Sequence, residues 1–427
     1  MRILLLGASG FIGRELYAAL EARGHAVVPA VRRAAAAPPF ARERPLQVDL
    51  GRDVDPEAWI PRLRGIDAVV NCAGILQDRG DQSSVAIHHR GPGALYRACE
   101  GAGVRRVVLV SAISADRDAG TAYAVTKLAG EDALRASSLD WVILRPSLVH
   151  ARGAHGGTAL FRGLAAFPFC IPVPGGGRQE FQPIHMDDLA RVIVKSVESG
   201  ELLGRTLDPV GPDVVTLGQM LVDYRQWLGL PSAPLVAIPH ALVAGATRIG
   251  DLVGGPLNST ALAQLEHGNT GDYADFVEQS GIAGAGWRDA LARHPAHTQD
   301  RWHARLYFAR PLLRVTLALL WLVSGLAGLF ALRDWAPRLA GLLGIGGPPA
   351  LVMLIAACAC DIVIAALVLA RWRPPVLAGI QVVVIAVYTL AGTAMEPGLW
   401  AAPLGPLLKN LPIVAAALAL GAIEDER

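Results

Sequence analysis

The sequence predicts an α/β head with a doubly wound parallel sheet and a small substrate-binding part, followed by a four-helix transmembrane bundle. Three observations support this fold class. Short apolar runs alternate with helical patterns early in the 427 residues, which is typical of a parallel sheet with both faces covered. A glycine-rich turn, GASGFIG, follows the first apolar run. Beyond Pro311, four apolar stretches reach the roughly 18 residues that a membrane-spanning helix needs.

Composition narrows the class of protein. The chain is 52% hydrophobic and 18% charged, whereas soluble domains average about 25% charged residues, and most of the deficit lies in the tail. The net charge of only +2 does not indicate a large positively charged surface, so no nucleic-acid partner is expected. The five cysteines are scattered without metal-ligand spacing, so neither a metal site nor a disulfide framework is expected.

The length predicts two or three domains, at roughly 100–200 residues each. We predict a dinucleotide-binding core over residues 1–150, a substrate-binding part over residues 151–300 and a membrane domain over residues 301–427. Met1-Arg2 runs straight into a short apolar run that ends at Gly7. This start is unlike a signal peptide, so the head is expected to stay in the cytoplasm.

Apolar runs and helical spacing alternate through the head. The strands of the sheet are expected at residues 3–6, 25–31, 68–70, 107–110 and 141–144, with a shorter run at 46–48. Helices are expected at residues 14–23, 91–102 and 122–136. Ligands of open α/β sheets bind at the carboxyl ends of the strands. Candidate functional residues are therefore sought directly after these runs.

The glycine turn after the first strand predicts a dinucleotide site. Gly7 permits a tight turn, Gly10 permits close approach of the backbone to a pyrophosphate, and Gly13 permits close packing of helix on strand. The helix that follows offers free N–H groups to phosphate. A plain glycine turn is the alternative. The predicted cofactor-binding residues of this turn are Gly7, Ser9, Gly10, Phe11, Ile12 and Gly13.

Two further positions bear on the nucleotide. Arg32-Arg33 ends the second strand, where an acid usually holds the ribose of NAD and an arginine suits the 2′-phosphate of NADP. We therefore favour NADP, with NAD possible; two solvated arginines are the alternative. Asp49-Leu50 ends the short third run. Asp49 is expected to meet the adenine amino group or to cap a turn.

Tyr123 and Lys127 stand four residues apart on a predicted helix, so both side chains lie on one helix face. A lysine beside a phenol is expected to lower the tyrosine pKa from its reference of about 10. Such a tyrosine exchanges a proton with a substrate oxygen while hydride moves to or from nicotinamide. Ser111, after the fourth strand, is expected to hydrogen-bond the same oxygen. A surface Tyr–Lys pair is the alternative.

These motifs together resemble the extended or atypical short-chain dehydrogenase/reductase superfamily, which has a Rossmann fold. The subgroup that they resemble includes the nucleotide-binding accessory subunit of respiratory complex I. The resemblance covers roughly residues 1–300, and the residues that carry it are GASGFIG, NCAGI (71–75), LVSAIS (109–114), YAVTKLAGE (123–131), LRPSLV (144–149) and PIHMDDLA (183–190).

The resemblance implies further site residues. Cys72, Ala73 and Gly74 would line the cofactor channel, and Pro146 and Ser147, with Leu148, would border the nicotinamide. It also implies catalytic roles for Ser111, Tyr123 and Lys127. One departure is notable, because many extended members have an asparagine where this chain has His88, three residues before Gly91. The usual lysine-orienting water network is therefore in doubt, and a plain polar residue entering a helix is the alternative.

The segment after residue 150 is expected to recognise the substrate. Arg178, Gln182 and His185 are candidates for the pocket, although turns and caps explain them equally well, and Asp187 or Asp188 is the expected N-cap of a helix. No cluster of Arg or Lys suggests a nucleotide-sugar diphosphate. The apolar run at 161–174 suits a lipophilic substrate or a contact with the membrane domain.

Residues 281–310 are expected to form a hinge at the lipid headgroup boundary, because aromatic residues alternate with arginines there. A soluble packing surface is the alternative. The aromatic residues are Trp287, Trp302, Tyr307 and Phe308.

The tail resembles DoxX-like four-helix membrane domains, through residues 310–328 and 396–413. The spans are expected at residues 315–332, 349–370, 374–395 and 404–423. Two charged residues, Asp361 and Lys409, fall inside them, and such residues usually face a bundle interior or a cavity. We expect them to face each other or a quinone-sized cavity, with Lys409 snorkelling to the interface as the alternative.

The loop charges predict a multi-pass protein of a bacterial-type inner membrane with both termini in the cytoplasm. The basic residues on the predicted cytoplasmic side are Arg301, Arg305, Arg310, Arg314, Arg371 and Arg373. The leading functional prediction is a membrane-bound NAD(P)-dependent oxidoreductase that acts on a carbonyl, an alcohol or a lipophilic, quinone-like small molecule. The alternatives are a non-catalytic NAD(P)-binding sensor or assembly protein, and a sugar epimerase or dehydratase.

Overall fold

The computed structural model describes residues 1–78, 80–115, 120–253, 258–403 and 405–424. The chain divides into two compact units, Met1–Ala304 and Arg305–Arg427. We call them the head and the membrane unit.

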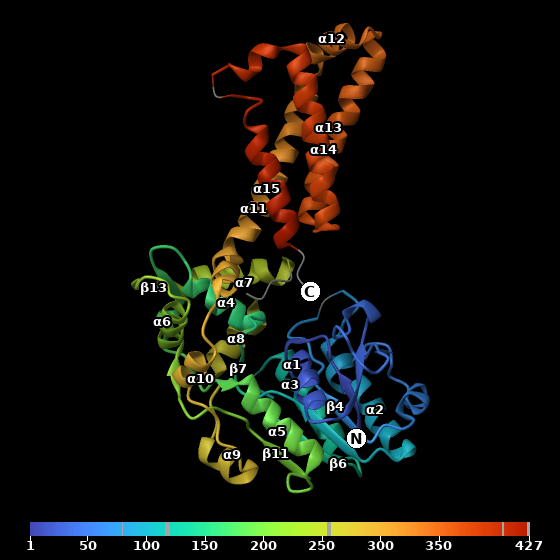
Figure 1. Cartoon of the computed structure of the whole chain (residues 1–427), viewed down its shortest axis with the longest axis vertical. Helices are drawn as coiled ribbons and strands as arrows, with labels where there is room; N and C mark the ends of the chain where they lie inside the picture. The colour runs from blue at the N-terminus through green and yellow to red at the C-terminus, as the bar shows by residue number, and fades with distance from the viewer. Residues whose placement is uncertain (79, 116–119, 254–257, 404, 425–427) are drawn as a thin grey trace. The chain divides into compact units, whose positions relative to one another are not determined.

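The head contains a sheet of seven parallel strands in the order β11-β6-β5-β4-β1-β2-β3 (Figure 1). The predicted doubly wound α/β fold is thereby confirmed. β11 was not predicted, because its three residues, RTL, contain no apolar run. The strands are β1 Arg2–Leu6, β2 Ala26–Val31, β3 Leu46–Gln47, β4 Ala68–Asn71, β5 Arg106–Val110, β6 Asp140–Leu144 and β11 Arg205–Leu207.

Helices cover both faces of this sheet. On one face, α1 (Phe11–Ala22) and α5 (Met186–Glu198) bury apolar side chains such as Leu16 and Val192. On the other face, α2 (Gly91–Ala102) and α3 (Ala122–Arg135) bury side chains such as Leu95. The strands are buried on both sides, which explains why they are continuous apolar runs without alternation.

The remaining elements of the head surround the carboxyl edge and flank of the sheet. Three small pairs of strands are β7 (Val149–His150) with β10 (Ile184–His185), β9 (Glu180–Phe181) with β12 (Val215–Thr216), and β8 (Ile171–Pro174) with β13 (Leu235–Ile238). The helices are α4 Gly156–Ala165, α6 Leu217–Trp227, α7 His240–Val253, α8 Ser259–His267, α9 Tyr273–Ser280 and α10 Trp287–Arg293. Short helical turns lie at η1 Ala34–Ala36, η2 Pro56–Ala58, η3 Ile60–Leu63, η4 Ala86–Arg90 and η5 Gly175–Gly177.

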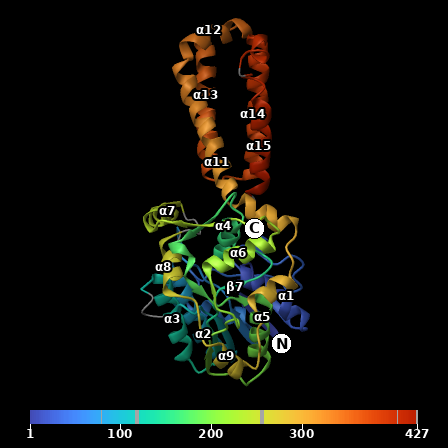
Figure 2. The same cartoon turned by 90° about the vertical axis from the view of Figure 1, so that its left-hand side faces the viewer.

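The membrane unit is a helical bundle (Figure 2). α11 (Thr298–Phe330), α13 (Gly347–Leu369) and α14 (Pro374–Met395) are long and apolar enough to cross a membrane, whereas α15 (Asn410–Ile423) is shorter. Among the described residues, three of the four predicted spans are therefore helices of spanning length, and the fourth is present as the shorter apolar helix α15. The fourth predicted span contains Pro406, which lacks the backbone N–H that a helix needs, and α15 begins after it, at Asn410. α12 (Leu332–Leu343) and the turn η6 (Pro397–Trp400) connect the others.

Polar contacts inside the membrane unit correct the expectation for Asp361. Its carboxylate accepts a hydrogen bond from the Tyr388 hydroxyl at 2.7 Å. Lys409 is exposed at the N-cap position of α15, and no ion pair between Lys409 and Asp361 is found among the described residues. A second buried pair joins the Trp321 indole N–H to Gln381 at 2.8 Å. Asp361 and Gln381 thus each accept a hydrogen bond from an uncharged donor.

The expected aromatic boundary at residues 281–310 is only partly correct. Trp287 lies in the core of the head, fully buried, with its indole N–H donated to Asp223. Trp302 is exposed near the start of α11. Trp287 therefore belongs to the head, and only the aromatic residues of α11 remain available to a lipid boundary.

Candidate active site

The glycine turn has the geometry that a dinucleotide requires. Gly7 adopts φ +73°, and the Gly10 N–H donates to the Gly7 carbonyl at 2.8 Å. A Cβ at Gly13 would lie 2.1 Å from the Gly7 oxygen, and a Cβ at Gly7 would lie 2.9 Å from the backbone of Ala73. α1 begins directly after Gly10 without a side-chain cap. Its first N–H groups are therefore left for an anion, and the residues fit a bound pyrophosphate.

Around this turn lie the residues expected to meet the rest of the nucleotide. The Phe11 ring stacks on His155 at 5.8 Å between centroids. The Arg32 side chain is exposed after β2, and its carbonyl accepts from the Gln47 amide. The Asp49 carboxylate accepts a hydrogen bond from the Gly51 N–H at 3.0 Å. Asp49 therefore caps a turn, which is one of the two roles that we expected for it. Leu50 is buried in the core.

Tyr123 and Lys127 both belong to α3, after β5. Burial raises the pKa of Tyr123 to about 12, and burial lowers the pKa of Lys127 to about 8. The Lys127 ammonium donates to the Val110 carbonyl at 3.1 Å. Our expectation of a lowered tyrosine pKa is therefore wrong for this arrangement, because Lys127 is bound to the end of β5. Tyr123 is a protonated phenol at neutral pH.

His88 connects two parts of the candidate site. Its Nε2 accepts from the Ile75 N–H at 3.0 Å, and its Nδ1 lies 2.9 Å from the Thr126 hydroxyl oxygen. Because Nε2 accepts, the ring proton is on Nδ1 and is donated to Thr126. The Tyr123 ring packs edge-on against the imidazole at 5.6 Å. Burial, followed by the charge of Lys127, lowers the pKa of His88 to about 3, so the ring is neutral and both nitrogens are occupied.

Ser111 is bound to a buried ionic cluster that the motif analysis did not single out. Its hydroxyl donates to Glu131 at 2.5 Å, and Glu131 is completely buried. Arg145 makes a bidentate ion pair with Glu131, with a shortest distance of 2.6 Å, and Arg135 makes another at 2.7 Å. With its proton donated to Glu131, Ser111 has only acceptor capacity left in this arrangement. Glu131 is the last residue of the motif YAVTKLAGE, and this motif was the sequence signal from which its importance could have been predicted.

The loop after β4 forms one wall of the site. A Cβ at Gly74 would lie 3.1 Å from the Lys127 nitrogen and 3.4 Å from His88 Nε2, so these three residues are in close contact. Burial raises the pKa of Cys72 to about 12, and the thiol therefore stays protonated. In the segment after β6, the Pro146 carbonyl accepts from the Ile113 N–H at 3.1 Å, and the Ser147 hydroxyl donates to the Gln182 carbonyl.

The candidate pocket residues have structural roles. Gln182 is buried and joins the Gly211 carbonyl to the Gly271 N–H, at 2.8 Å each. His185 caps α5 by accepting from the Asp187 N–H; our expectation that Asp187 or Asp188 is the cap is wrong. Arg178 is exposed.

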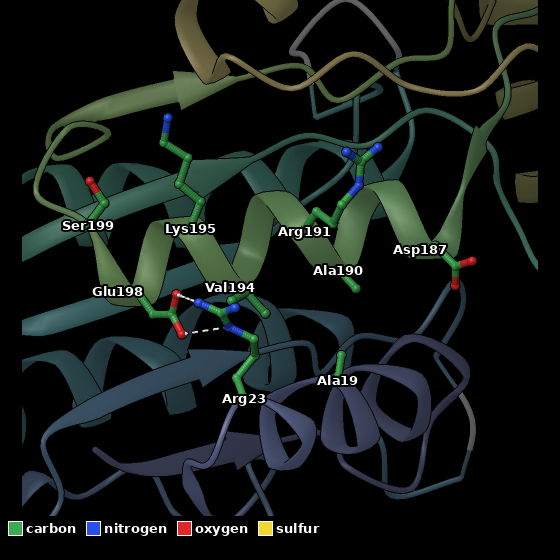
Figure 3. A pocket seen from close by; sticks show the side chains of 9 residues that line it. All are labelled: Ala19, Arg23, Asp187, Ala190, Arg191, Val194, Lys195, Glu198 and Ser199. Atoms are coloured by element: carbon green, nitrogen blue, oxygen red, sulfur yellow. Dashed lines mark hydrogen bonds and ion pairs between the residues drawn. The ribbon is translucent and has the colours of Figure 1, made fainter.

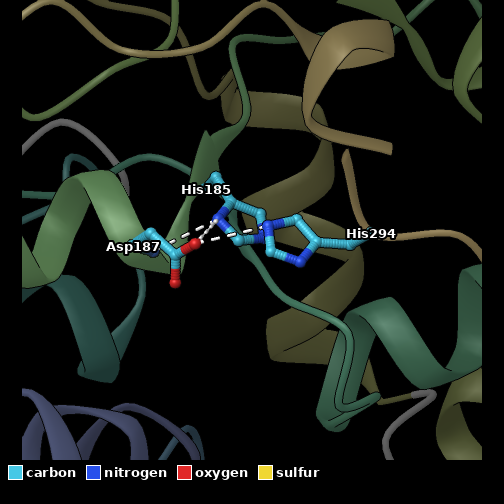
Figure 4. Close-up of side chains that lie close together, drawn as sticks. All are labelled: His185, Asp187 and His294. Atoms are coloured by element: carbon cyan, nitrogen blue, oxygen red, sulfur yellow. Dashed lines mark hydrogen bonds and ion pairs between the residues drawn. The ribbon is translucent and has the colours of Figure 1, made fainter. Parts of the chain in front are cut away.

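His185 also belongs to a group of three titratable side chains (Figure 4). The rings of His185 and His294 stack at 4.4 Å with 12° between their planes. An oxygen of Asp187 lies 3.4 Å from one ring and 3.3 Å from the other. A bound metal ion lies in the plane of each imidazole that coordinates it, and near-parallel stacked rings do not direct their lone pairs at one point. We therefore assign this cluster to capping and stacking.

A groove with a volume of about 500 Å³ lies between α1 and α5 (Figure 3). Arg23 and Glu198 form a two-point ion pair across it, with distances of 3.1 and 2.8 Å. The groove lies on the flank of the helical layer and contains none of the glycine-turn or Tyr123 residues. It is therefore separate from the candidate active site.

Two protein families match the chain. The NAD(P)H-binding family matches residues 7–199, and the DoxX-like family matches residues 318–418. The first match begins at the glycine turn and ends with α5. The second covers most of the membrane unit.

Curated relatives match the head. A ceramide reductase of Caulobacter vibrioides is 31% identical, over 57% of this chain and 76% of the relative. A 3-diazoavenalumate denitrifying reductase of a Streptomyces species is 32% identical, over 57% of this chain and 86% of the relative. Subunit 9 of the mitochondrial NADH dehydrogenase (ubiquinone) 1 alpha subcomplex of Arabidopsis thaliana is 28% identical, over 55% of this chain and 62% of that subunit.

Solved structures share the fold of the head. MoeE5 in complex with UDP-glucuronic acid and NAD has a TM-score of 0.54 and 22% identity, and it covers 71% of this chain and 99% of its own. WbmG of Bordetella bronchiseptica in complex with NAD has a TM-score of 0.53 and 18% identity, over 68% and 92% of the two chains. At this level of identity the likeness establishes the fold alone.

Proposed function

Because the chain belongs to the NAD(P)H-binding short-chain dehydrogenase/reductase family and carries a C-terminal DoxX-like domain, we propose that it is a membrane-bound carbonyl reductase acting on a lipophilic substrate. The observation that carries the proposal is the placement of Tyr123 and Lys127. They share α3 at the carboxyl edge of the sheet, and Lys127 and His88 pack against the loop after β4.

The chemistry that these residues support is reduction of a carbonyl to an alcohol. NAD(P)H, when bound, supplies the hydride that the carbonyl carbon accepts. Tyr123 is protonated, with a pKa of about 12, and donates its phenolic proton to the carbonyl oxygen. In the proposed reaction the Lys127 ammonium, protonated below its pKa of about 8, turns from the Val110 carbonyl toward Tyr123 and stabilises the resulting phenolate by its charge. Gly7, Gly10 and Gly13 would hold the pyrophosphate of the cofactor at the start of α1.

A lipid carbonyl is the substrate class that we favour. A relative of the head is named a ceramide reductase, and this chain has three apolar helices long enough to cross a bilayer among its described residues. The apolar segment at residues 161–174 supports the same class, because it includes buried Phe161 and Leu164 beside the β8 strand.

We base the choice of cofactor and the orientation in the membrane on the positions of arginine residues. Exposed Arg32 after β2 suits the 2′-phosphate of NADP, so NADPH is the proposed hydride donor. The excess of arginines in the first part of α11 and between α13 and α14 favours a cytoplasmic head and C-terminus in a bacterial-type inner membrane, where NADPH is accessible.

The test is cofactor oxidation by the full chain in nanodiscs. NADPH and NADH would each be offered with a long-chain keto-lipid, a quinone, a water-soluble aldehyde and a nucleotide sugar, and Tyr123→Phe would be the matched control. We expect oxidation of NADPH with the keto-lipid and a loss of at least about 100-fold in Tyr123→Phe, with nucleotide binding retained. Equal rates for wild type and Tyr123→Phe would exclude the proposed chemistry.

A non-catalytic NAD(P)-binding protein is the second candidate. It is favoured by the similarity to a respiratory-complex subunit and by His88, which stands where many family members have asparagine. In this case the purified chain would retain a nucleotide and would oxidise NADPH with none of the substrates. Mass spectrometry of the nucleotide released on denaturation would identify it as NADP or NAD.

A further inference from the structure

Two surface segments of the head contain no charged residue. Residues 163–177 and 226–247 have no Asp, Glu, Lys or Arg, although soluble surfaces are rich in them. Within these segments, Phe169 is 92% exposed and Leu242 is 65% exposed. Ile249, at 63%, lies two turns after Leu242 on the same face of α7. We call the exposed group the apolar surface; it consists of Phe167, Phe169, Leu235, Val236, Leu242 and Ile249.

The two segments lie side by side. β8 and β13 pair in parallel, with Ile171 opposite Leu235, and the Ile171 N–H donates to the Pro234 carbonyl at 2.8 Å. The buried guanidinium of Arg225 donates to the carbonyls of Ala165 and Phe167 in the first segment and of Pro231 in the second. The part of the apolar surface that lies on β8 and β13 is thus held in place by backbone and side-chain hydrogen bonds.

This surface lies where the chain leaves the head. Ala304 of α11 packs against Ala166 and Leu228, one from each uncharged segment. The Arg301 side chain also donates to the Leu228 carbonyl at 2.9 Å. A short stretch of α11 separates Ala304 from Val315, where the first apolar span begins.

We propose that the apolar surface docks on the lipid bilayer that holds the membrane unit. Exposed aromatic and aliphatic side chains on a short amphipathic helix are typical of segments that lie in the membrane interface. Exposed Arg178 and Arg248 border the uncharged segments and suit anionic headgroups. Because α11 anchors the head to the membrane, the effective concentration of lipid near the apolar surface is high. A modest apolar area is then enough for this surface to bind the bilayer. The inference does not depend on which carbonyl is reduced.

The experiment uses the full chain in nanodiscs. An environment-sensitive fluorescent amino acid would be encoded at position 242 or 169, and at Val54 as the control, which is 43% exposed in the nucleotide-binding half. Lipids carrying a nitroxide near the headgroup would quench a docked label. We expect quenching at positions 242 and 169 to exceed that at position 54 several-fold, with a blue-shifted emission.

Two outcomes would overturn the proposal. One is quenching at position 242 no greater than at position 54. The other is emission that changes with the number of copies per disc and not with the quencher, which would make the surface a contact between copies. A second variant, Leu242→Asp with Ile249→Asp, is expected to reduce quenching at position 169 to the control level. If that variant does not fold, the labels in the unaltered surface still decide.

Discussion

At the scale of single residues, His88 shows how a departure from a family pattern acquires a structural role. The imidazole joins the loop after β4 to α3 through Ile75 and Thr126, and it supports the Tyr123 ring. Neither nitrogen is free to transfer a proton. The sequence indicated that position 88 is unusual, but only the folded structure shows that the His88 ring is neutral and joins two elements by hydrogen bonds.

A neutral buried histidine makes stability depend on pH. The pKa of His88 is lowered from 6.5 to about 3. Between these two pH values His88 is therefore protonated in the unfolded chain and neutral in the folded chain. Stability from this residue is complete above about pH 6.5 and is lost as the pH falls toward 3, by at most about 1.4 kcal/mol per pH unit. Thermal unfolding followed between pH 7 and 5 should show a smaller decrease for His88→Asn than for wild type. An identical decrease in both would mean that His88 titrates normally.

Glu131 gives a second prediction for a single residue. Removing a buried carboxylate leaves Arg145 and Arg135 facing each other without their shared partner. Breaking a buried ion pair from one side costs about 3–5 kcal/mol. Glu131→Ala should therefore lower the free energy of unfolding by about that amount in denaturant titrations. Asp132→Ala is the matched control, since Asp132 is half exposed and pairs with Arg135 on the surface; a cost as small as the control's would contradict the role given to the cluster.

At the scale of elements, continuous apolar runs were sufficient to predict most of the sheet. β1, β2, β4, β5 and β6 were expected within one or two residues of their observed bounds. β11 was missed, since a short edge strand has no pattern of its own and forms because β6 offers a free edge. The cap of α5 was misassigned for a similar reason, because a histidine accepts a backbone N–H only in the neutral state that burial enforces.

The glycine turn allows an element-level prediction about nucleotide binding. A Cβ at Gly13 would lie 2.1 Å from the Gly7 oxygen, so Gly13→Ala must displace α1 from the turn. NADPH affinity, measured by fluorescence titration, should fall at least about tenfold, which corresponds to about 1.4 kcal/mol.

The matched control is Gly101→Ala in α2. An added Cβ there has no neighbour within 4 Å, and alanine favours helix over glycine by up to about 1 kcal/mol. Nucleotide affinity should be unchanged and thermal stability equal or higher. Equal affinities for the two variants would show that the turn does not hold the nucleotide.

At the scale of the whole molecule, composition predicted the division into a nucleotide-binding head and a membrane unit. The four predicted spans correspond to three helices of spanning length and the shorter α15, which begins only after Pro406; hydropathy alone does not predict where that helix starts. The hydrogen bond between Asp361 and Tyr388 was equally hidden, since it depends on how α13 and α14 pack. Periodicity identifies elements, whereas partners between elements require the fold.

The presence of the head and the membrane unit in one chain leads us to a prediction about how the reaction rate depends on substrate concentration. An enzyme anchored in a bilayer meets a lipid substrate at its concentration within the membrane, so the rate should follow the mole fraction of substrate in the lipid. Adding vesicles of the same composition should leave the rate per enzyme unchanged, whereas diluting the substrate with inert lipid should lower it in proportion below saturation. A water-soluble aldehyde serves as the control, because its rate should follow bulk concentration alone. NADPH oxidation by the full chain in proteoliposomes measures both. Dependence of the lipid-substrate rate on bulk concentration at fixed mole fraction would place the reaction in water and remove the reason for joining this head to membrane helices.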